Sequence, residues 1–346
     1  SITKSNIQEM NQMHIELRSD TFTKPGPAML EAMLHAEVGD DVFGEDPTTN
    51  RLEQYAAELF SFEAGLYCVS GTMANQIAIS VYVRPGDEVI CDALSHIYLY
   101  EGGGIAANSM ASVTLLDGDR GRITAAQIEE VIKEDNVHYP VSRLVSLENT
   151  VNKGGGSIYE MSDLNEIRNL CSAKNLSLHL DGARLCNAIV ARNQSTKDFA
   201  PIFDSISVCL SKGLGAPMGS VLLGTKEFIH KARRVRKRWG GGWRQSGFMA
   251  AAGLHALQNN IPGLADDHRR ARQLASILET RSEVTSILPV DTNIVIFSVD
   301  PGYSSSAEYV RKLASKGLFA SPFGAQKIRL VTHLDFTDSD LEDARI

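Results

Sequence analysis

The sequence predicts an α/β protein with a large domain, built on a mostly parallel sheet flanked by helices, and a smaller C-terminal α+β domain. Short β-rich runs alternate with helical patterns up to about residue 260, which is typical of crossover units on a buried sheet. After that point the order changes to a long charged helix followed by strand, helix and strand. The length of 346 residues is enough for roughly two domains.

Seven short apolar runs are the expected strands of the large domain. They span residues 65–70, 87–92, 112–116, 143–149, 176–182, 205–211 and 220–225. In open α/β sheets, ligands bind outside the carboxyl ends of the strands. We therefore expect the functional residues to follow these runs.

Helical periodicity marks the segments between and after the strands. The apolar residues of 52–60 recur at i, i+3, i+4, i+7 and i+8, the spacing of an amphipathic helix, and 124–135 and 161–175 read the same way. In the C-terminal part, we expect a helix over 264–281, strands over 293–299 and 327–334, and a helix over 306–317 between them. These patterns predict a tail over 1–13, a large domain over 14–260 and a small domain over 261–346. The helical pattern of 339–346 runs to the last residue, so we expect a further C-terminal segment.

Composition and charge exclude several classes of protein. The formal net charge is −8, which disfavours nucleic acid or an anionic membrane as a partner, although one basic run, His230 to Arg238, opposes this background. No apolar run approaches the roughly 18 residues that span a bilayer, and the polar start is no signal peptide. The five cysteines show no metal-binding spacing, so we expect reduced core thiols in a cytoplasmic protein.

Four side chains follow the ends of expected strands, and each also has a structural explanation. Lys212 either ends a strand at the surface or has its nitrogen held in a covalent bond, because an unpaired lysine is costly to bury. Asp181 and Arg184 either cap a helix and pair with each other, or hold a ring nitrogen and a substrate carboxylate. His96 is either a structural histidine or a catalyst.

The stretch SGTMANQ leads from a strand into a helix through Ser70, Gly71 and Thr72. Glycine lets the backbone approach a ligand, threonine supplies a hydroxyl, and a helix N-terminus supplies unpaired N–H groups, which together suit a phosphate. A plain N-cap turn is the alternative. Taken together, a strand-end lysine, a phosphate-binding turn, a carboxylate and an arginine are the set that pyridoxal phosphate needs, with the lysine as its Schiff base.

Eight stretches, in order, carry a family resemblance that covers nearly the whole chain. They are ELRSDTFTKP, AEVGDDVFGEDPTTN, SGTMANQ, SHIYLYEGGG, HLDGARLCNA, CLSKGLGAPMGS, GGGWRQSG and IRLVTHLD. With them the chain resembles the low-specificity L-threonine aldolase family, which are pyridoxal phosphate enzymes of fold type I, the aspartate-aminotransferase-like fold. The resemblance implies that Lys212 is the Schiff-base lysine, that Asp181 pairs with the pyridine nitrogen, that His96 lies against the ring face, and that residues 70–72 bind the phosphate.

The resemblance also implies how substrate is held and how subunits share a site. Ser19, Arg184 and Arg329 would hold the carboxylate of an amino-acid substrate, and Arg184 would also contact the cofactor. Because the active site of this family lies between subunits, we expect a homo-oligomer, a dimer or tetramer, in which Lys237 and Arg244 reach a neighbour's site. The basic run around Lys237 equally fits a solvated helix face.

Two positions depart from the family pattern. Phe43, which we also expect near a neighbouring subunit's site, stands where the family has tyrosine, and Val151 stands where the family has histidine. Both family side chains are polar and lie near the substrate. The departures leave the scaffold intact and leave the preference among β-hydroxy isomers open.

The implied reaction is reversible cleavage of L-threonine, L-allo-threonine and related β-hydroxy-α-amino acids to glycine and an aldehyde. His96, Lys212 or a bound water would take the proton of the β-hydroxyl. One alternative keeps the cofactor but makes the protein an amino-acid racemase or a β-eliminating lyase, and only the aldolase releases glycine. The other is a catalytically silent scaffold, which would lack the absorption band of the cofactor.

Overall fold

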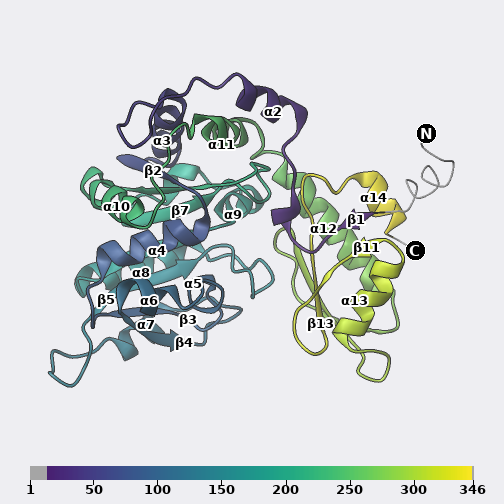
Figure 1. Ribbon diagram of the computed structural model, residues 1–346. Helices are drawn as coiled ribbons and strands as arrows, with labels where there is room; N and C mark the ends of the chain where they lie inside the picture. Colours follow the sequence, from purple (N-terminus) through teal and green to yellow (C-terminus); the bar gives the residue numbers. More distant parts are fainter. Residues whose placement is uncertain (1–13, 345–346) are drawn as a thin grey trace.

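The structure is a computed structural model that describes residues 14–344, so the tail expected over 1–13 lies outside the described residues. Figure 1 shows a large lobe, in which helices surround a central sheet, beside a smaller lobe formed by the C-terminal elements. No helix of the described part is both long enough and apolar enough to cross a membrane.

The large lobe is built on a seven-stranded sheet in the order β2-β8-β7-β6-β5-β3-β4. The strands are β2 (Ala64–Cys68), β3 (Glu88–Asp92), β4 (Ser112–Leu116), β5 (Ser142–Glu148), β6 (Ser177–Gly182), β7 (Ser205–Cys209) and β8 (Ser220–Gly224). Each corresponds to one of the seven predicted runs. Pairing is parallel from β4 through β3, β5 and β6 to β7, and β8 runs antiparallel to both of its neighbours. The predicted fold class is therefore confirmed.

Helices cover both faces of this sheet, so its strands are buried and need no alternation of polar residues. They are α2 (Pro27–Leu34), α3 (Pro47–Phe60), α4 (Gly71–Tyr82), α5 (His96–Leu99), α6 (Gly104–Ser109), α7 (Ala125–Val131), α8 (Met161–Ala173), α9 (Leu185–Arg192), α10 (Lys226–Arg238) and α11 (Gly247–Asn259), with short 3-10 helices η2 (Asp20–Phe22) and η3 (Thr196–Asp198). The predicted helix 52–60 begins earlier, because Asp46 caps it by accepting a hydrogen bond from the Thr49 N–H at 2.8 Å. Helix α7 is shorter than predicted and begins at a capping box of Thr124 and Gln127.

The small lobe contains an antiparallel sheet in the order β12-β13-β10-β9. Its elements are α12 (Leu264–Glu279), β9 (Val284–Ile287), β10 (Ile294–Val299), α13 (Ser306–Ser315), β11 (Leu318–Phe319), β12 (Ser321–Pro322), β13 (Lys327–Val331) and α14 (Asp338–Asp343). Strand β1 (Ile15–Glu16) pairs in parallel with β11, so the N-terminal segment starts in this lobe and then leads toward the large sheet. Since side chains alternate along a strand, Ile328 and Leu330 face the small-lobe core while Arg329 lies on the opposite face.

Candidate active site

The carboxyl ends of the parallel strands bring the predicted residues to one edge of the large sheet. Glu148 at the end of β5 is directly opposite Asp181 on β6, and Asp181 is opposite Ser207 on β7. Lys212 follows β7 by three residues, and His96 opens α5, which follows β3. The register of the sheet therefore places side chains that are far apart in the sequence around one site.

Asp181 is held as a buried hydrogen-bond acceptor. Asp181 is only 2% exposed. Its Oδ2 accepts from Asn75 Nδ2 at 2.9 Å, and its Oδ1 accepts from the Ala183 N–H at 3.0 Å. Two donors satisfy the charged form of the carboxylate. A carboxylate held in this way is suited to keep a ring nitrogen protonated.

Asn75 on α4 connects Asp181 to other buried polar residues through hydrogen bonds. The same Nδ2 group donates to Glu101 at 3.0 Å, while Oδ1 accepts from Ser207 Oγ at 2.7 Å and lies 3.2 Å from His179 Nε2. Burial lowers the pKa of His179 to about 4, so the ring is neutral at ordinary pH. This network gives Asn75 one orientation, with its amide nitrogen toward the carboxylates.

His96 is oriented by a second buried carboxylate. Its Nδ1 lies 3.0 Å from Glu101 Oε1, and Glu101 Oε2 accepts from Gln76 Nε2 at 2.6 Å. Burial opposes protonation, but Glu101, with further help from Asp181, raises the pKa of His96. The hydrogen bond at Nδ1 fixes the ring plane and leaves Nε2 for another partner.

Lys212 is half-buried, three residues after β7, and no carboxylate of the described residues is bound to its ammonium group. The hydrogen bond that its Nζ forms within residues 14–344 goes to Cys209 Sγ, at 3.4 Å. Burial and Arg184 act to lower the pKa of Lys212, but nearby Cys209, Asp20 and Asp181 raise it overall. This amine therefore lies beside charged groups at the sheet edge, and its covalent role stays a prediction.

The N-terminus of α4 comes close to Lys212 because residue 71 is glycine. A Cβ atom at Gly71 would lie 2.9 Å from Cys209 Sγ, the atom that Lys212 contacts. Ser70 caps the helix by accepting the Met73 N–H at 3.1 Å, and the N–H groups of the first helical residues have no partner within a helix. Thr72 is exposed beside them. This donor set fits the phosphate of pyridoxal phosphate, and the Lys212 amine fits its aldehyde.

Arg184 forms a buried ion pair that the sequence analysis missed. Its Nε and Nη2 donate to the two carboxylate oxygens of Asp20, both at 2.7 Å, and Asn293 Nδ2 adds a longer bond at 3.3 Å. Burial would raise the pKa of Asp20, but Arg184 lowers it to about 2. The pair leaves Nη1 of Arg184 for a ligand. Ser19 caps η2 next to Asp20, accepting the Thr21 N–H at 3.3 Å.

Arg329 reaches the same region from β13. Its Nη1 donates to Asn152 Oδ1 at 2.8 Å and its Nη2 to the Arg18 carbonyl at 3.0 Å, while the buried Nε has no partner among the described residues. Burial and the nearby charge of Arg184 lower the pKa of Arg329 to about 10. Two guanidinium groups that repel each other, one with an unpaired N–H, are suited to bind an anion between them.

Lys237, Arg244 and Phe43 stand apart from this cluster in the single chain. Lys237 lines a separate basic cavity on α10 with Arg233 and Arg234, and Arg244 pairs with Asp40 at 2.8 Å. Phe43 is 75% exposed. Their expected roles concern a neighbouring subunit, so those roles stay predictions.

Val151 is buried, at 1% exposure, and forms an isolated bridge with Ser157. It packs over Gly121, since a Cβ atom there would lie 2.5 Å from Val151 Cγ1. The position after β5 where the family has histidine is therefore part of an apolar contact in this chain.

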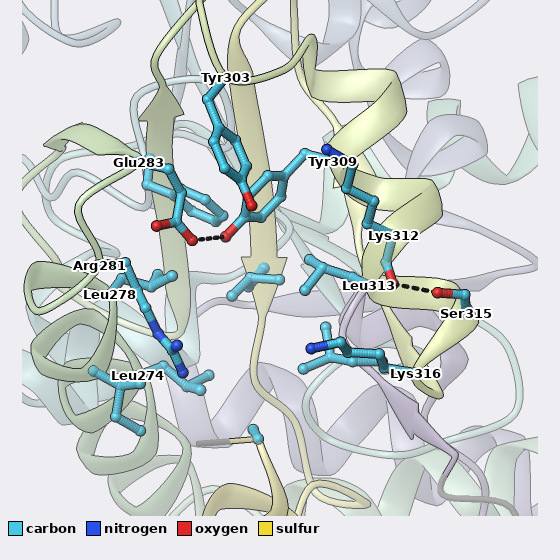
Figure 2. Close-up of a pocket in the computed structure, with 15 residues that line it drawn as sticks. Leu274, Leu278, Arg281, Glu283, Tyr303, Tyr309, Lys312, Leu313, Ser315 and Lys316 are labelled. Atoms are coloured by element: carbon cyan, nitrogen blue, oxygen red, sulfur yellow. Dashed lines mark hydrogen bonds between the residues drawn. The ribbon is translucent and has the colours of Figure 1, made fainter. Parts of the chain in front are cut away.

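A second cavity lies in the small lobe, between α12, α13 and the sheet. Its volume is about 390 Å³, and Figure 2 shows its polar groups around a largely aliphatic interior. Tyr309 Oη donates to Glu283 Oε1 at 3.1 Å, and Lys312 and Lys316 lie on the opposite wall. None of the predicted site residues lines this cavity. The chemistry-bearing residues thus gather at the sheet edge and not in this cavity.

The sequence and the fold of this chain are similar to those of known proteins. A model of the beta-eliminating lyase family matches residues 16–301. The low specificity L-threonine aldolase of Escherichia coli strain K12 is 41% identical over 330 residues, covering 95% of this chain and 96% of that protein. The probable low-specificity L-threonine aldolase 2 of Arabidopsis thaliana is 40% identical, covering 95% and 94%. A solved threonine aldolase structure from Leishmania major shares the fold, with a TM-score of 0.83 at 21% identity over 96% of this chain and 97% of that one.

Proposed function

The chain belongs to the beta-eliminating lyase family and, within it, to the low-specificity L-threonine aldolases, and on that premise we propose that it cleaves L-threonine, L-allo-threonine and related β-hydroxy-α-amino acids to glycine and an aldehyde. The curated relatives favour this activity over that of a racemase. The observation that carries the proposal is the half-buried Lys212 amine near Asp181, with the two guanidinium groups of Arg184 and Arg329 close by.

We propose that the cofactor is pyridoxal 5'-phosphate, which when bound supplies an electron sink for the negative charge that develops at the substrate Cα. Lys212 Nζ is the amine that binds its aldehyde carbon, and Asp181 keeps its ring nitrogen protonated. His96 lies against the ring face. Ser70, Gly71 and Thr72 bind the phosphate at the N-terminus of α4, where the helix dipole favours an anion.

We propose that Arg184 and Arg329, with Ser19, bind the substrate carboxylate. Arg184 is fixed by Asp20 and Arg329 by Asn152, so neither guanidinium group needs to reorganise when the anion arrives. A carboxylate held at a fixed position sets the rotation of the substrate about its Cα–N bond, and that rotation selects which bond at Cα breaks. His96, Lys212 or a bound water would take the proton of the β-hydroxyl.

We propose that the protein is a cytoplasmic homo-oligomer, a tetramer or a dimer, whose subunits share active sites. Lys237 and Arg244 would then contribute positive charge to a neighbour's site, with Phe43 beside them. The basic cavity around Lys237 and the 75% exposure of Phe43 support this arrangement, since a large exposed aromatic side chain is suited to an interface. The five cysteines are free and buried, which agrees with a reducing compartment.

A product assay tests the function. L-threonine, L-allo-threonine and phenylserine are supplied side by side, and we expect glycine and the matching aldehyde from each. Lys212→Ala should lose the borohydride-reducible link to the cofactor and reduce turnover by roughly 10³-fold. The matched control is Lys197→Ala, because Lys197 is an exposed lysine on η3, which packs against α3. A reducible link that survives in Lys212→Ala would show that another amine is used, and absence of glycine would refute the aldolase.

A further inference from the structure

Glu148 is a buried carboxylate at the centre of the site to which none of the steps above assigns a role. It is the last residue of β5, only 4% exposed, and lies beside Asp181 in the neighbouring strand. Burial and then the charge of Asp181 raise the pKa of Glu148 to about 7. A buried acid next to another acid is unfavourable, so its presence calls for an explanation in the contacts it makes.

Each carboxylate oxygen of Glu148 accepts a hydrogen bond from a backbone N–H group, one at the start of α5 and one in the turn after β5. Oε2 accepts from the His96 N–H and Oε1 from the Asn152 N–H, each at 2.8 Å. His96 is the first residue of α5, a helix of four residues whose own N-cap residue, Ser95, forms no side-chain cap. Glu148, at the end of β5, therefore supplies the acceptor that the N-terminus of this short helix lacks.

The second contact leads to the substrate side of the site. Asn152, whose N–H is held by Glu148, accepts Arg329 Nη1 through its side-chain Oδ1 at 2.8 Å. Arg329 is on β13 of the small lobe, so this chain of two hydrogen bonds joins the end of β5 to the other lobe. Displacement of the Asn152 backbone would move the acceptor that aims Arg329.

We propose that Glu148 is a positioning residue that fixes the two ends of the site with one carboxylate: the His96 ring on the cofactor side and the Arg329 guanidinium on the carboxylate side. It acts through backbone N–H groups and has no contact with a reactant. The inference rests on the proposed function, because it takes His96 and Arg329 as cofactor and substrate contacts. A small misplacement of such groups costs a large factor in rate.

Three variants and one control separate the two contacts of Glu148, one to the His96 N–H and one to the Asn152 N–H. Glu148→Ala removes both acceptors, and Glu148→Gln keeps the shape but replaces one acceptor by an amide NH₂ group. Asn152→Ala leaves its own N–H in place and removes only the acceptor for Arg329. Ser146→Ala is the control, because Ser146 is equally buried on the same strand and its Oγ has no partner among the described residues.

Two measurements are made on the holoenzyme: the steady-state constants for L-threonine and the visible circular dichroism of the bound cofactor, which reports how its ring is held. Glu148→Ala should raise KM about tenfold, lower kcat by about tenfold or more and change the dichroism. Asn152→Ala should raise KM to a similar extent with the dichroism unchanged. Ser146→Ala should match the wild type in both measurements. If Glu148→Ala does not fold, Glu148→Gln is read in the same way, with smaller changes in the same directions.

The proposal is overturned if the Glu148 variants lower only the melting temperature and leave KM, kcat and dichroism unchanged, or if Ser146→Ala changes them as much. It is also overturned if Asn152→Ala alters the dichroism and leaves KM unchanged. Failure of the proposed function has a different signature, because the wild type would then release no glycine. In that case the dichroism still reports on the contact to His96, and the affinity for glycine, measured by equilibrium dialysis, still reports on the contact that leads to Arg329.

Discussion

Replacing Asp20 by asparagine should destabilise the protein and weaken binding of the substrate carboxylate. Asp20 is fully buried and both of its carboxylate oxygens accept from Arg184 at 2.7 Å. Asparagine keeps the shape but presents an NH₂ group where one of the acceptors was. Arg184 would then be left as a buried cation with half of its hydrogen bonds.

The magnitude follows from two independent estimates. Breaking a buried ion pair by removing one partner costs about 3–5 kcal/mol, because the other charge stays buried and unpaired. The lowered pKa of Asp20, about 2 against 3.8 for an ordinary aspartate, corresponds to about 2 kcal/mol of stability. The second value is smaller because it measures only the loss of the charge on Asp20. Since the pKa is lowered on folding, this stabilisation is fully present above pH 3.8 and is lost as the pH falls through about 2.

The assay is thermal unfolding of the holoenzyme together with KM for L-threonine. A loss of 3–5 kcal/mol in a chain of this length lowers the melting temperature by about 4–7 °C. Glu227→Gln is the control, because Glu227 pairs with Lys231 on the surface, where its side chain is 80% exposed, and an exposed pair contributes little. The double variant Asp20→Leu with Arg184→Met should recover much of the stability, since apolar groups can replace a buried pair, but none of the activity. The reasoning is refuted if Asp20→Asn melts within a degree of the wild type, or if the double variant is less stable than the single one.

Three further predictions concern the other site residues and the pH dependence of stability. Asp181→Asn should keep the cofactor but lower kcat roughly tenfold to a hundredfold, because a charge-assisted hydrogen bond contributes about 1.5–3 kcal/mol; a loss below threefold counts against the role. Asp267 is buried, its Oδ1 accepts no hydrogen bond among the described residues and lies 3.9 Å from Arg270 Nη1, and burial raises its pKa to about 7 from 3.8. Its contribution to stability therefore falls as the pH rises from about 4 through 7. Asp267→Asn should therefore reduce the difference in melting temperature between pH 5 and pH 8, and an unchanged difference would contradict this. With Phe43 and Val151 in place of polar family residues, the enzyme should accept both L-threonine and L-allo-threonine, because apolar pockets separate close analogues by only about 1–3 kcal/mol. Phe43→Tyr with Val151→His should shift the ratio of kcat/KM between the two isomers, and strict selectivity in the natural enzyme would disprove the idea.

The strands of the large sheet could be predicted because the sheet is covered on both faces. Most of its strands are buried and largely apolar, as in β8, where all five residues are buried. The antiparallel direction of β8 could not be predicted, since apolar runs carry no sign of direction. Strands β1, β11 and β12 have two residues each, too few to show a period. Strands β1 and β11 form because segments at opposite ends of the chain pair with each other.

Site residues could be predicted from the sequence where they lie at or just after a strand end. They could not be predicted where their role depends on partners that are distant in the sequence. Lys212 and Asp181 follow apolar runs, and the topology brings such positions together. Asn75 lies within a helix and joins Asp181 to Glu101 only after the fold has formed. Glu148 gave one signal, a charged residue at the end of an apolar run, which it shares with Asp92 at the end of β3.

The two arginines of the site differ in which of their nitrogens already donate to an acceptor. Arg184 has Nε and Nη2 committed to Asp20, a pair that burial makes costly to break, so it serves as a fixed positive charge with one nitrogen to offer. Arg329 has weaker ties, to an amide oxygen and a backbone carbonyl, and its buried Nε is unpaired. An unpaired buried N–H is unfavourable until an acceptor arrives. On the proposed function, the substrate carboxylate would supply that acceptor at Arg329 and relieve the repulsion between the two cations, whereas two nitrogens of Arg184 already have their acceptors in Asp20.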